Sequence, residues 1–115
     1  MAKNIFENFD FDEYAELLQA AKDDDIHVVH TFDPEYHKGG FTIAWQRDGD
    51  FANGKKRGKM INVAISYCSD EDYFSRKIGA RNALTNAYSG RFIQLPIGNF
   101  ESDTIVNLLR GTFSV

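Results

Sequence analysis

Apolar side chains first recur at the spacing of a helix in the stretch that contains Tyr14, Leu17, Leu18 and Ala21. The residues suited to cap the start of this helix are Asn8, Asp10 and Asp12. The acidic residues 23–25 would be unfavourable inside the C-terminal turn, where the helix dipole is negative. We therefore expect the helix to end near Lys22.

Three later stretches, residues 26–33, 40–48 and 60–68, are rich in β-branched and aromatic residues and are separated by turn signals. They predict three strands of an antiparallel meander. Large apolar residues such as Ile43 and Trp45 alternate with small or polar ones such as Thr42 and Ala44. This pattern predicts a sheet with one strongly apolar face under helices, and a second face that is wet or lined for a ligand or partner.

The remaining pattern predicts a helix over residues 69–90, a short strand over 91–97 and a final helix over 102–113. Ser69 is the expected N-cap of the second helix, and Ser102 or Asp103 that of the last. Pro96 places the short strand toward an edge. The order is α-β-β-β-α-β-α, which predicts an α+β fold with one four-stranded, mainly antiparallel sheet and helices packed on one face.

The length of 115 residues fits a single domain over residues 1–115. No stretch approaches the roughly 20 apolar residues of a membrane span, and the acidic N-terminus lacks the apolar region of a signal peptide, so we expect a cytoplasmic protein with no membrane partner. The lone Cys68 has no disulfide partner in the chain and no neighbouring zinc ligands. It is expected to be a buried, small apolar residue.

The net charge of −4 is unevenly distributed. Residues 1–53 hold 12 acidic and 4 basic residues, whereas residues 54–95 hold 3 acidic and 8 basic residues. A surface that attracts anions is therefore expected in the second half of the chain.

Cations occupy an unexpected position in the second predicted helix. On a wheel of about 100° per residue, Lys77 and Arg81 fall within the apolar arc, which is formed by Tyr73, Phe74, Ile78, Leu84 and Tyr88. Two interpretations stand. The cations lay their apolar stems along a buried face and send their charges to water, or the arc accepts an anionic ligand or a second subunit. The candidate ligand-binding residues are Arg76, Lys77, Arg81, Tyr88 and Arg91.

A second basic feature is the stretch 53–59, "NGKKRGK", which is typical of a solvated hairpin loop and would attract phosphate if it faced the helix cations. It is too short to indicate duplex nucleic acid and lacks the Walker A spacing. His27 and His30 lie on opposite faces of a strand by parity, so no metal site is expected. No serine has a nucleophile context. We predict no catalytic residues and no cofactor.

The stretch "INVAISYCSDEDYFSRKIGARNALTNAYSGRFIQLP", 36 residues, resembles a pattern of small accessory proteins of tailed bacteriophages, most closely in "FSRKIG" followed by Arg81. Among these it is similar to the anti-Thoeris sponge proteins. The resemblance implies a homo-oligomer in the host cytoplasm that sequesters a cyclic nucleotide immune signal, cyclic ADP-ribose-like or a cyclic oligonucleotide, without cleaving it.

Two alternatives remain at this point. The acidic first half of the chain would suit a protein-binding inhibitor of the anti-restriction or anti-CRISPR type, which imitates the charge of nucleic acid on a basic host target. The third and weaker alternative is a phosphodiesterase-like enzyme that acts on the same signals.

Overall fold

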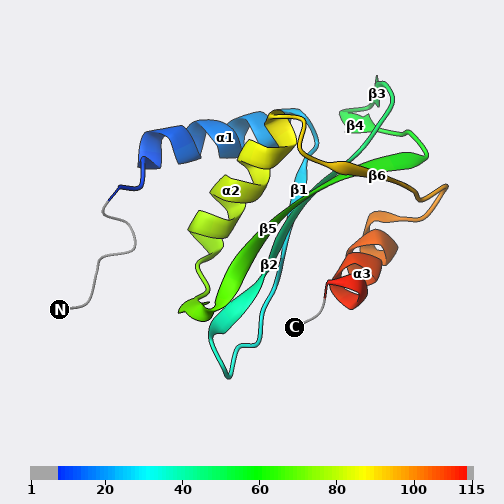
Figure 1. Cartoon of the computed structure of the whole chain (residues 1–115). Coiled ribbons are helices and arrows are strands. Elements are labelled where there is room, and N and C mark those ends of the chain that lie inside the picture. Colours follow the sequence, from blue (N-terminus) through cyan, green and yellow to red (C-terminus); the bar gives the residue numbers. More distant parts are fainter. Residues whose placement is uncertain (1–7, 114–115) are drawn as a thin grey trace.

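The structure is a computed structural model that describes residues 8–113; residues 1–7 of the acidic N-terminal stretch and residues 114–115 lie outside the described part. Figure 1 shows a curved sheet between helices. In chain order the elements are α1 (Phe11–Asp23), β1 (His27–Thr31), β2 (Lys38–Arg47), β3 (Phe51–Ala52), β4 (Lys55–Lys56), β5 (Met60–Tyr73), α2 (Arg76–Tyr88), β6 (Ile93–Pro96) and α3 (Ser102–Thr112).

The predicted fold class is confirmed. Four antiparallel strands form one sheet in the order β1-β2-β5-β6, and three helices accompany it in the predicted order. The short strand that contains Pro96 lies at an edge, as expected. The basic stretch 53–59 belongs to a small additional ribbon, β3 and β4, at one end of the molecule (Figure 1).

The helices cover both faces of the sheet, whereas we expected them on one (Figure 1). α3 packs on the face with the large apolar residues, through Ile105 and Leu109 against Ile43, Trp45, Ile61 and Val63. α1 and α2 pack on the opposite face, which carries Ala44 and Ala64. Each face therefore has its own core, and the face predicted to be wet or to line a site lies beneath α2.

The small residues of this second face allow α2 to approach the sheet closely. A Cβ atom added at Gly79 would lie 2.1 Å from Thr42 Oγ1, well inside van der Waals contact. Ala80 and Ala83 of α2 are also buried. α2 is thus held against the sheet by small residues on both sides of the contact.

The start of α2 corrects a second expectation. Ser69 does not cap the helix, because β5 continues to Tyr73, which pairs with Lys38 of β2. The pairing shifts register between Lys38 and Gly40, so the acidic residues 69–72 form an irregular, extended segment of the strand. The observed N-cap is Ser75, whose side chain accepts a hydrogen bond from the Ile78 backbone N–H at 3.3 Å.

The other helix ends are close to the predicted ones. Asp10 caps α1 through the Glu13 backbone N–H at 3.0 Å, and the helix ends at Asp23, one residue beyond Lys22. The N-cap of α3 is Glu101 instead of Ser102 or Asp103, and it makes no side-chain capping bond. Among residues 8–113, no helix is long and apolar enough to cross a membrane.

We expect Gly79→Ala to lower the free energy of unfolding by about 1–3 kcal/mol, because the added methyl group forces α2 away from Thr42. Urea unfolding followed by circular dichroism measures the change. Thr42→Ala removes the nearest atom, so Gly79→Ala should cost less in that background.

The matched control is Gly111→Ala in α3, where an added Cβ would meet no atom within 4 Å. Its stability should be unchanged or raised by up to about 1 kcal/mol, since alanine favours helix. Equal effects of the two substitutions would contradict a close contact at Gly79.

Candidate functional site

The buried side of α2 differs from the apolar arc of the helical wheel. Gly79, Ala80, Ala83 and Leu84 are buried, whereas Lys77 is exposed and Arg81 is half-buried. The wheel included Tyr73, which belongs to β5, and Phe74, which precedes α2. Its apolar arc was defined by large side chains. Because the sheet face below α2 is itself lined by small side chains, three of these four buried residues are also small, and Leu84 is the exception.

Each of the three cations in the first half of α2 lies over an aromatic ring. The pairs are Arg76 over Phe32, Lys77 over Phe11 and Arg81 over Phe9, with the charged group 5.3, 5.4 and 5.0 Å from the ring centroid. Cation–π contacts of this kind stabilise by roughly 0.5–1 kcal/mol at exposed sites. These contacts account for the position of the cations on the flanks of α2 and link the helix to the segments around it.

Tyr88 and Arg91 lie at the other end of α2. Tyr88 donates a hydrogen bond to Asp24 Oδ2 at 2.6 Å, and partial burial together with the Asp24 carboxylate raises the pKa of Tyr88. Twelve residues of helical rise separate Arg76 from Tyr88, about 18 Å. The five predicted residues therefore do not surround one small ligand.

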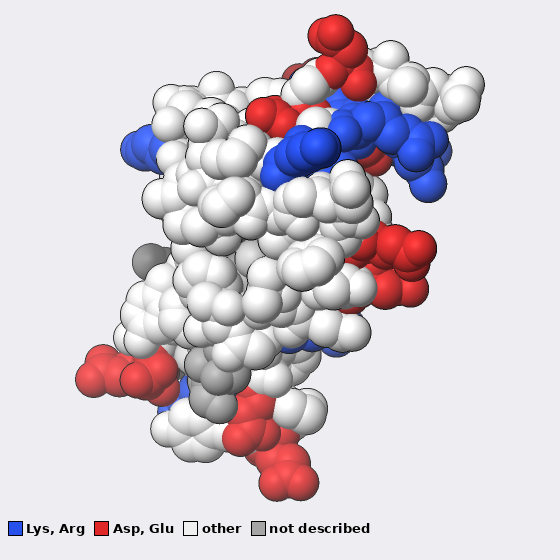
Figure 2. All heavy atoms as spheres, turned by 90° about the vertical axis from the view of Figure 1, so that its right-hand side faces the viewer, with Lys and Arg blue, Asp and Glu red and all other residues white. Residues whose placement is uncertain are grey.

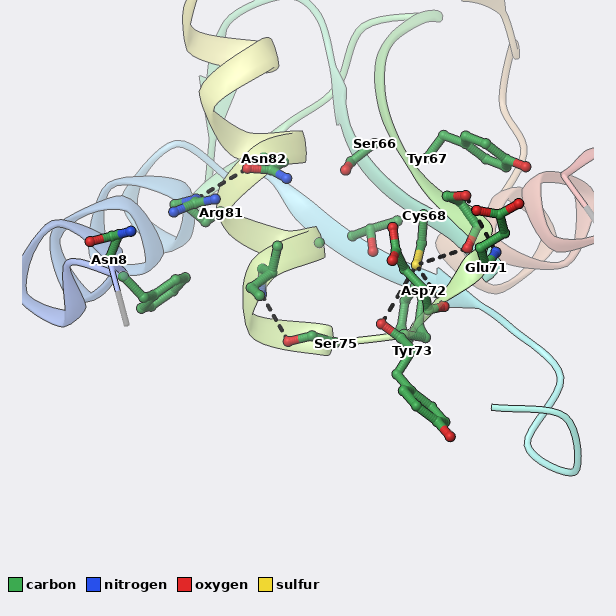
Figure 3. Close-up of a pocket in the computed structure, with 16 residues that line it drawn as sticks. Asn8, Ser66, Tyr67, Cys68, Glu71, Asp72, Tyr73, Ser75, Arg81 and Asn82 are labelled. Carbon is green, nitrogen blue, oxygen red and sulfur yellow. Dashed lines mark hydrogen bonds between the residues drawn. The ribbon is translucent and has the colours of Figure 1, made fainter. Parts of the chain in front are cut away.

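Arg81 alone among the five lines a cavity of about 560 Å³ between α2 and the end of β5. Figure 3 shows Arg81 and Asn82 on α2 at one side, and Cys68, Glu71 and Asp72 on β5 at the other. The volume lies within the roughly 300–1,000 Å³ of small-molecule sites. Most of the lining residues come from the end of β5, the turn that leads into α2, and the first half of α2.

The charges of this cavity are opposite on its two walls. Arg81 Nε donates to Asn82 Oδ1 at 3.1 Å, and no carboxylate of residues 8–113 lies within ion-pair distance of the guanidinium. Glu71 and Asp72 line the facing wall. The cavity thus offers an unneutralised cation on one side and two hydrogen-bond acceptors on the other.

The chain's cysteine, Cys68, also lines the cavity, and it is partly exposed, whereas we expected it to be buried. Cys68 Sγ lies 3.5 Å from the Asp72 carbonyl oxygen, and burial is the main cause that raises the pKa of the Cys68 thiol. The neutral thiol that this favours is a poor nucleophile. The nearest histidine on this face, His30, pairs through Nδ1 with Thr42 Oγ1 at 3.0 Å, and burial with the nearby Arg76 lowers the pKa of His30.

The histidines are arranged as strand parity predicts: His27 stacks on Trp45 on the α3 face, and His30 contacts Thr42 on the α2 face. Within the described part of the chain, no group of three or more His, Cys, Asp or Glu side chains is placed to hold a metal ion.

Asn82 and Thr42 also line the cavity but were not among the predicted site residues. Asn82 lies outside the apolar arc of the wheel, whereas Thr42 lies on the sheet face that strand alternation predicted to be wet or lined for a ligand. The basic ribbon lies apart from Arg81. The Lys56 backbone N–H donates to Asp25 Oδ2 at 3.2 Å, and Lys55, Lys56 and Arg57 line a second cavity with the start of α3.

Comparisons of the chain with protein-family models, with curated proteins and with solved structures found no match. The likeness to the phage proteins therefore rests on the residues quoted for it.

We expect Cys68 to react with iodoacetamide more slowly in the folded protein than in urea at pH 8. The raised pKa of the folded thiol lowers its thiolate fraction, so the folded rate should rise only at higher pH. Because the chain has one cysteine, mass spectrometry reads this site alone. A folded rate equal to or above the unfolded one would contradict a raised pKa of the partly buried thiol.

Proposed function

We propose that the protein binds a small nucleotide signal, cyclic ADP-ribose-like or a cyclic oligonucleotide, in the cavity beside Arg81, and does not cleave it. The observation that carries the proposal is the Arg81 guanidinium, which lines a ligand-sized cavity with no carboxylate of residues 8–113 to neutralise it. Arginine binds phosphate through a forked pair of N–H donors, which suits this position.

The facing wall supports a nucleotide over a simple anion. The amino groups of adenine and guanine are donors, and the Glu71 and Asp72 carboxylates are acceptors. A ligand with phosphate at one end and a base at the other would match both walls. In Figure 3 the rings of Tyr67 and Tyr73 point away from Arg81, so recognition in this arrangement relies on polar groups more than on stacking by these two tyrosines.

Binding without cleavage is supported by Cys68 and His30, the side chains near the cavity that could act as nucleophile or base. The pKa of Cys68 is raised, which favours the unreactive thiol, and His30 is engaged with Thr42. The phage origin, the host cytoplasm and assembly into a homo-oligomer belong to the same proposal and rest on the resemblance of residues 61–96 to the sponge proteins.

The test is depletion of free ligand from a panel of cyclic ADP-ribose and cyclic dinucleotides incubated with excess protein. We expect one ligand to disappear from the filtrate and to return with unchanged mass and retention time after heat denaturation. Arg81→Ala should weaken binding roughly 10- to 100-fold, the effect of losing hydrogen bonds to a charged group.

The matched control is Arg110→Ala, an exposed arginine on α3, which should bind as the native chain does. Ligand recovered in altered form would indicate an enzyme. Failure of every ligand to bind would defeat the proposal.

A second candidate function is inhibition of a basic host protein, and the exposed carboxylates of Asp70, Glu71 and Asp72 favour it. Asp70 accepts a hydrogen bond from the Tyr67 hydroxyl at 3.3 Å, and within residues 8–113 the carboxylates of Glu71 and Asp72 accept none.

If this second function holds, the protein should recover one host protein in stoichiometric amount from a bacterial lysate. The triple change Asp70→Lys, Glu71→Lys and Asp72→Lys should abolish the recovery, because it reverses the charge that a basic target would meet. Unchanged recovery with the triple variant would contradict an acidic interface at this segment.

A further inference from the structure

A second cavity, of about 370 Å³, lies at the β3–β4 end of the molecule, on the α3 side of the sheet. Its cationic lining residues are Arg47, Lys55, Lys56 and Arg57, against the two carboxylates of Asp25 and Glu101. Figure 2 shows Lys and Arg side chains gathered in a band at this end of the face that it presents. The cavity therefore has an excess of positive charge in a chain that is acidic overall.

Hydrogen bonds to backbone groups fix the walls of this cavity. Arg47 Nη1 donates to the carbonyl oxygens of Gly58 at 3.0 Å and Gly98 at 2.9 Å, which joins the basic ribbon to the loop before α3. The Lys56 backbone N–H donates to Asp25 Oδ2 at 3.2 Å. The ribbon is thus anchored to two separate parts of the chain, and the cations of residues 55–57 are presented on a supported loop.

The start of α3 brings backbone donors to the same place. Glu101 and Ser102 line the cavity, and Glu101 is an N-cap without a side-chain hydrogen bond to the first turn. The N–H groups of that turn therefore lack the side-chain acceptor that usually satisfies one of them. They and the helix dipole favour an anion at this end of the helix.

Trp45 gives an independent indication of a ligand. It lines the cavity and is 1% exposed, and its Nε1–H is buried without a hydrogen-bond acceptor among residues 8–113. By strand parity its indole shares the cavity's face of the sheet with Arg47, and it stacks on His27 at 4.4 Å between ring centroids. A buried indole N–H normally has a partner, and an oxygen of a bound anion would supply one.

From these three sources of donors we infer that the cavity binds the phosphate group of a small phosphorylated ligand. Lys55 and Arg57 supply the charge, the first turn of α3 supplies backbone N–H groups, and Trp45 Nε1–H is the donor at the buried side. The Asp25 carboxylate already accepts from the Lys56 backbone N–H and lies 3.2 Å from His27 Nε2, so its charge is partly engaged within the protein. This site is separate from the cavity beside Arg81.

The chain has one tryptophan, and it lines this cavity, so the indole signal comes from a single residue at the site. The experiment follows the indole N–H resonance and the tryptophan fluorescence during titration with inorganic phosphate, adenosine monophosphate and adenosine at constant ionic strength. We expect a saturable change with phosphate and with the monophosphate, and none with adenosine. Tighter binding of the monophosphate than of phosphate would identify a nucleotide as the source of the phosphate group.

The double change Lys55→Ala and Arg57→Ala should weaken phosphate binding at least tenfold. Lys59→Ala, in the same basic stretch but not among the residues that line the cavity, should leave binding unchanged. Arg81→Ala should also leave the indole titration unchanged, which separates this result from the test of the other cavity. An unresponsive indole, an equal response to adenosine, or equal weakening by Lys59→Ala would each overturn the inference.

Discussion

The close contact between α2 and the small-residue face of the sheet determines how the rest of the chain is arranged. Where Gly79 lies against Thr42, even an added Cβ atom would clash with the sheet. Lys77 and Arg81 are therefore placed on the flanks of α2, where the rings of Phe11 and Phe9 lie beside their charges. The large apolar residues of the sheet point to the other face, and they require a separate cover. α3 provides it, so the two-sided architecture follows from the difference between the faces.

Strand alternation was sufficient to predict the sheet and its two faces, because a period of two separates side chains whatever covers them. It did not predict what covers each face. In the sequence, a row of small side chains such as Ala44 and Ala64 indicates a weakly apolar surface that need not be covered. In the structure the same row is buried, because small size allows backbones to approach closely and many weak contacts to form. How closely a helix packs against a sheet depends on the tertiary structure, and it cannot be predicted from residue type alone.

The start of α2 and the grouping of the candidate residues show the same limit. Ser69 was the expected N-cap because acidic residues follow it, as they do in the first turn of many helices. The choice depends on the pairing of Tyr73 with Lys38 across the sheet, which a local pattern does not contain. The predicted set did include Arg81, which lines one cavity together with Cys68. Tyr88 was grouped with Arg81 by its angle around the helix, and Arg91 as a cation just past the helix end, although the rise along the helix axis separates Tyr88 and Arg91 from the cations at its start.

The way in which the cations are held bears on both cavities. Within residues 8–113 no arginine lies within ion-pair distance of a carboxylate, and the arginines that line the cavities are held by other groups. Arg81 lies over a ring and donates to an amide oxygen, while Arg47 donates to two carbonyl oxygens. Such partners position a guanidinium without cancelling its charge, whereas a carboxylate would cancel it. The fold therefore keeps uncancelled positive charge on each side of the sheet in an acidic protein, and phosphate-bearing ligands carry the chemistry that complements it.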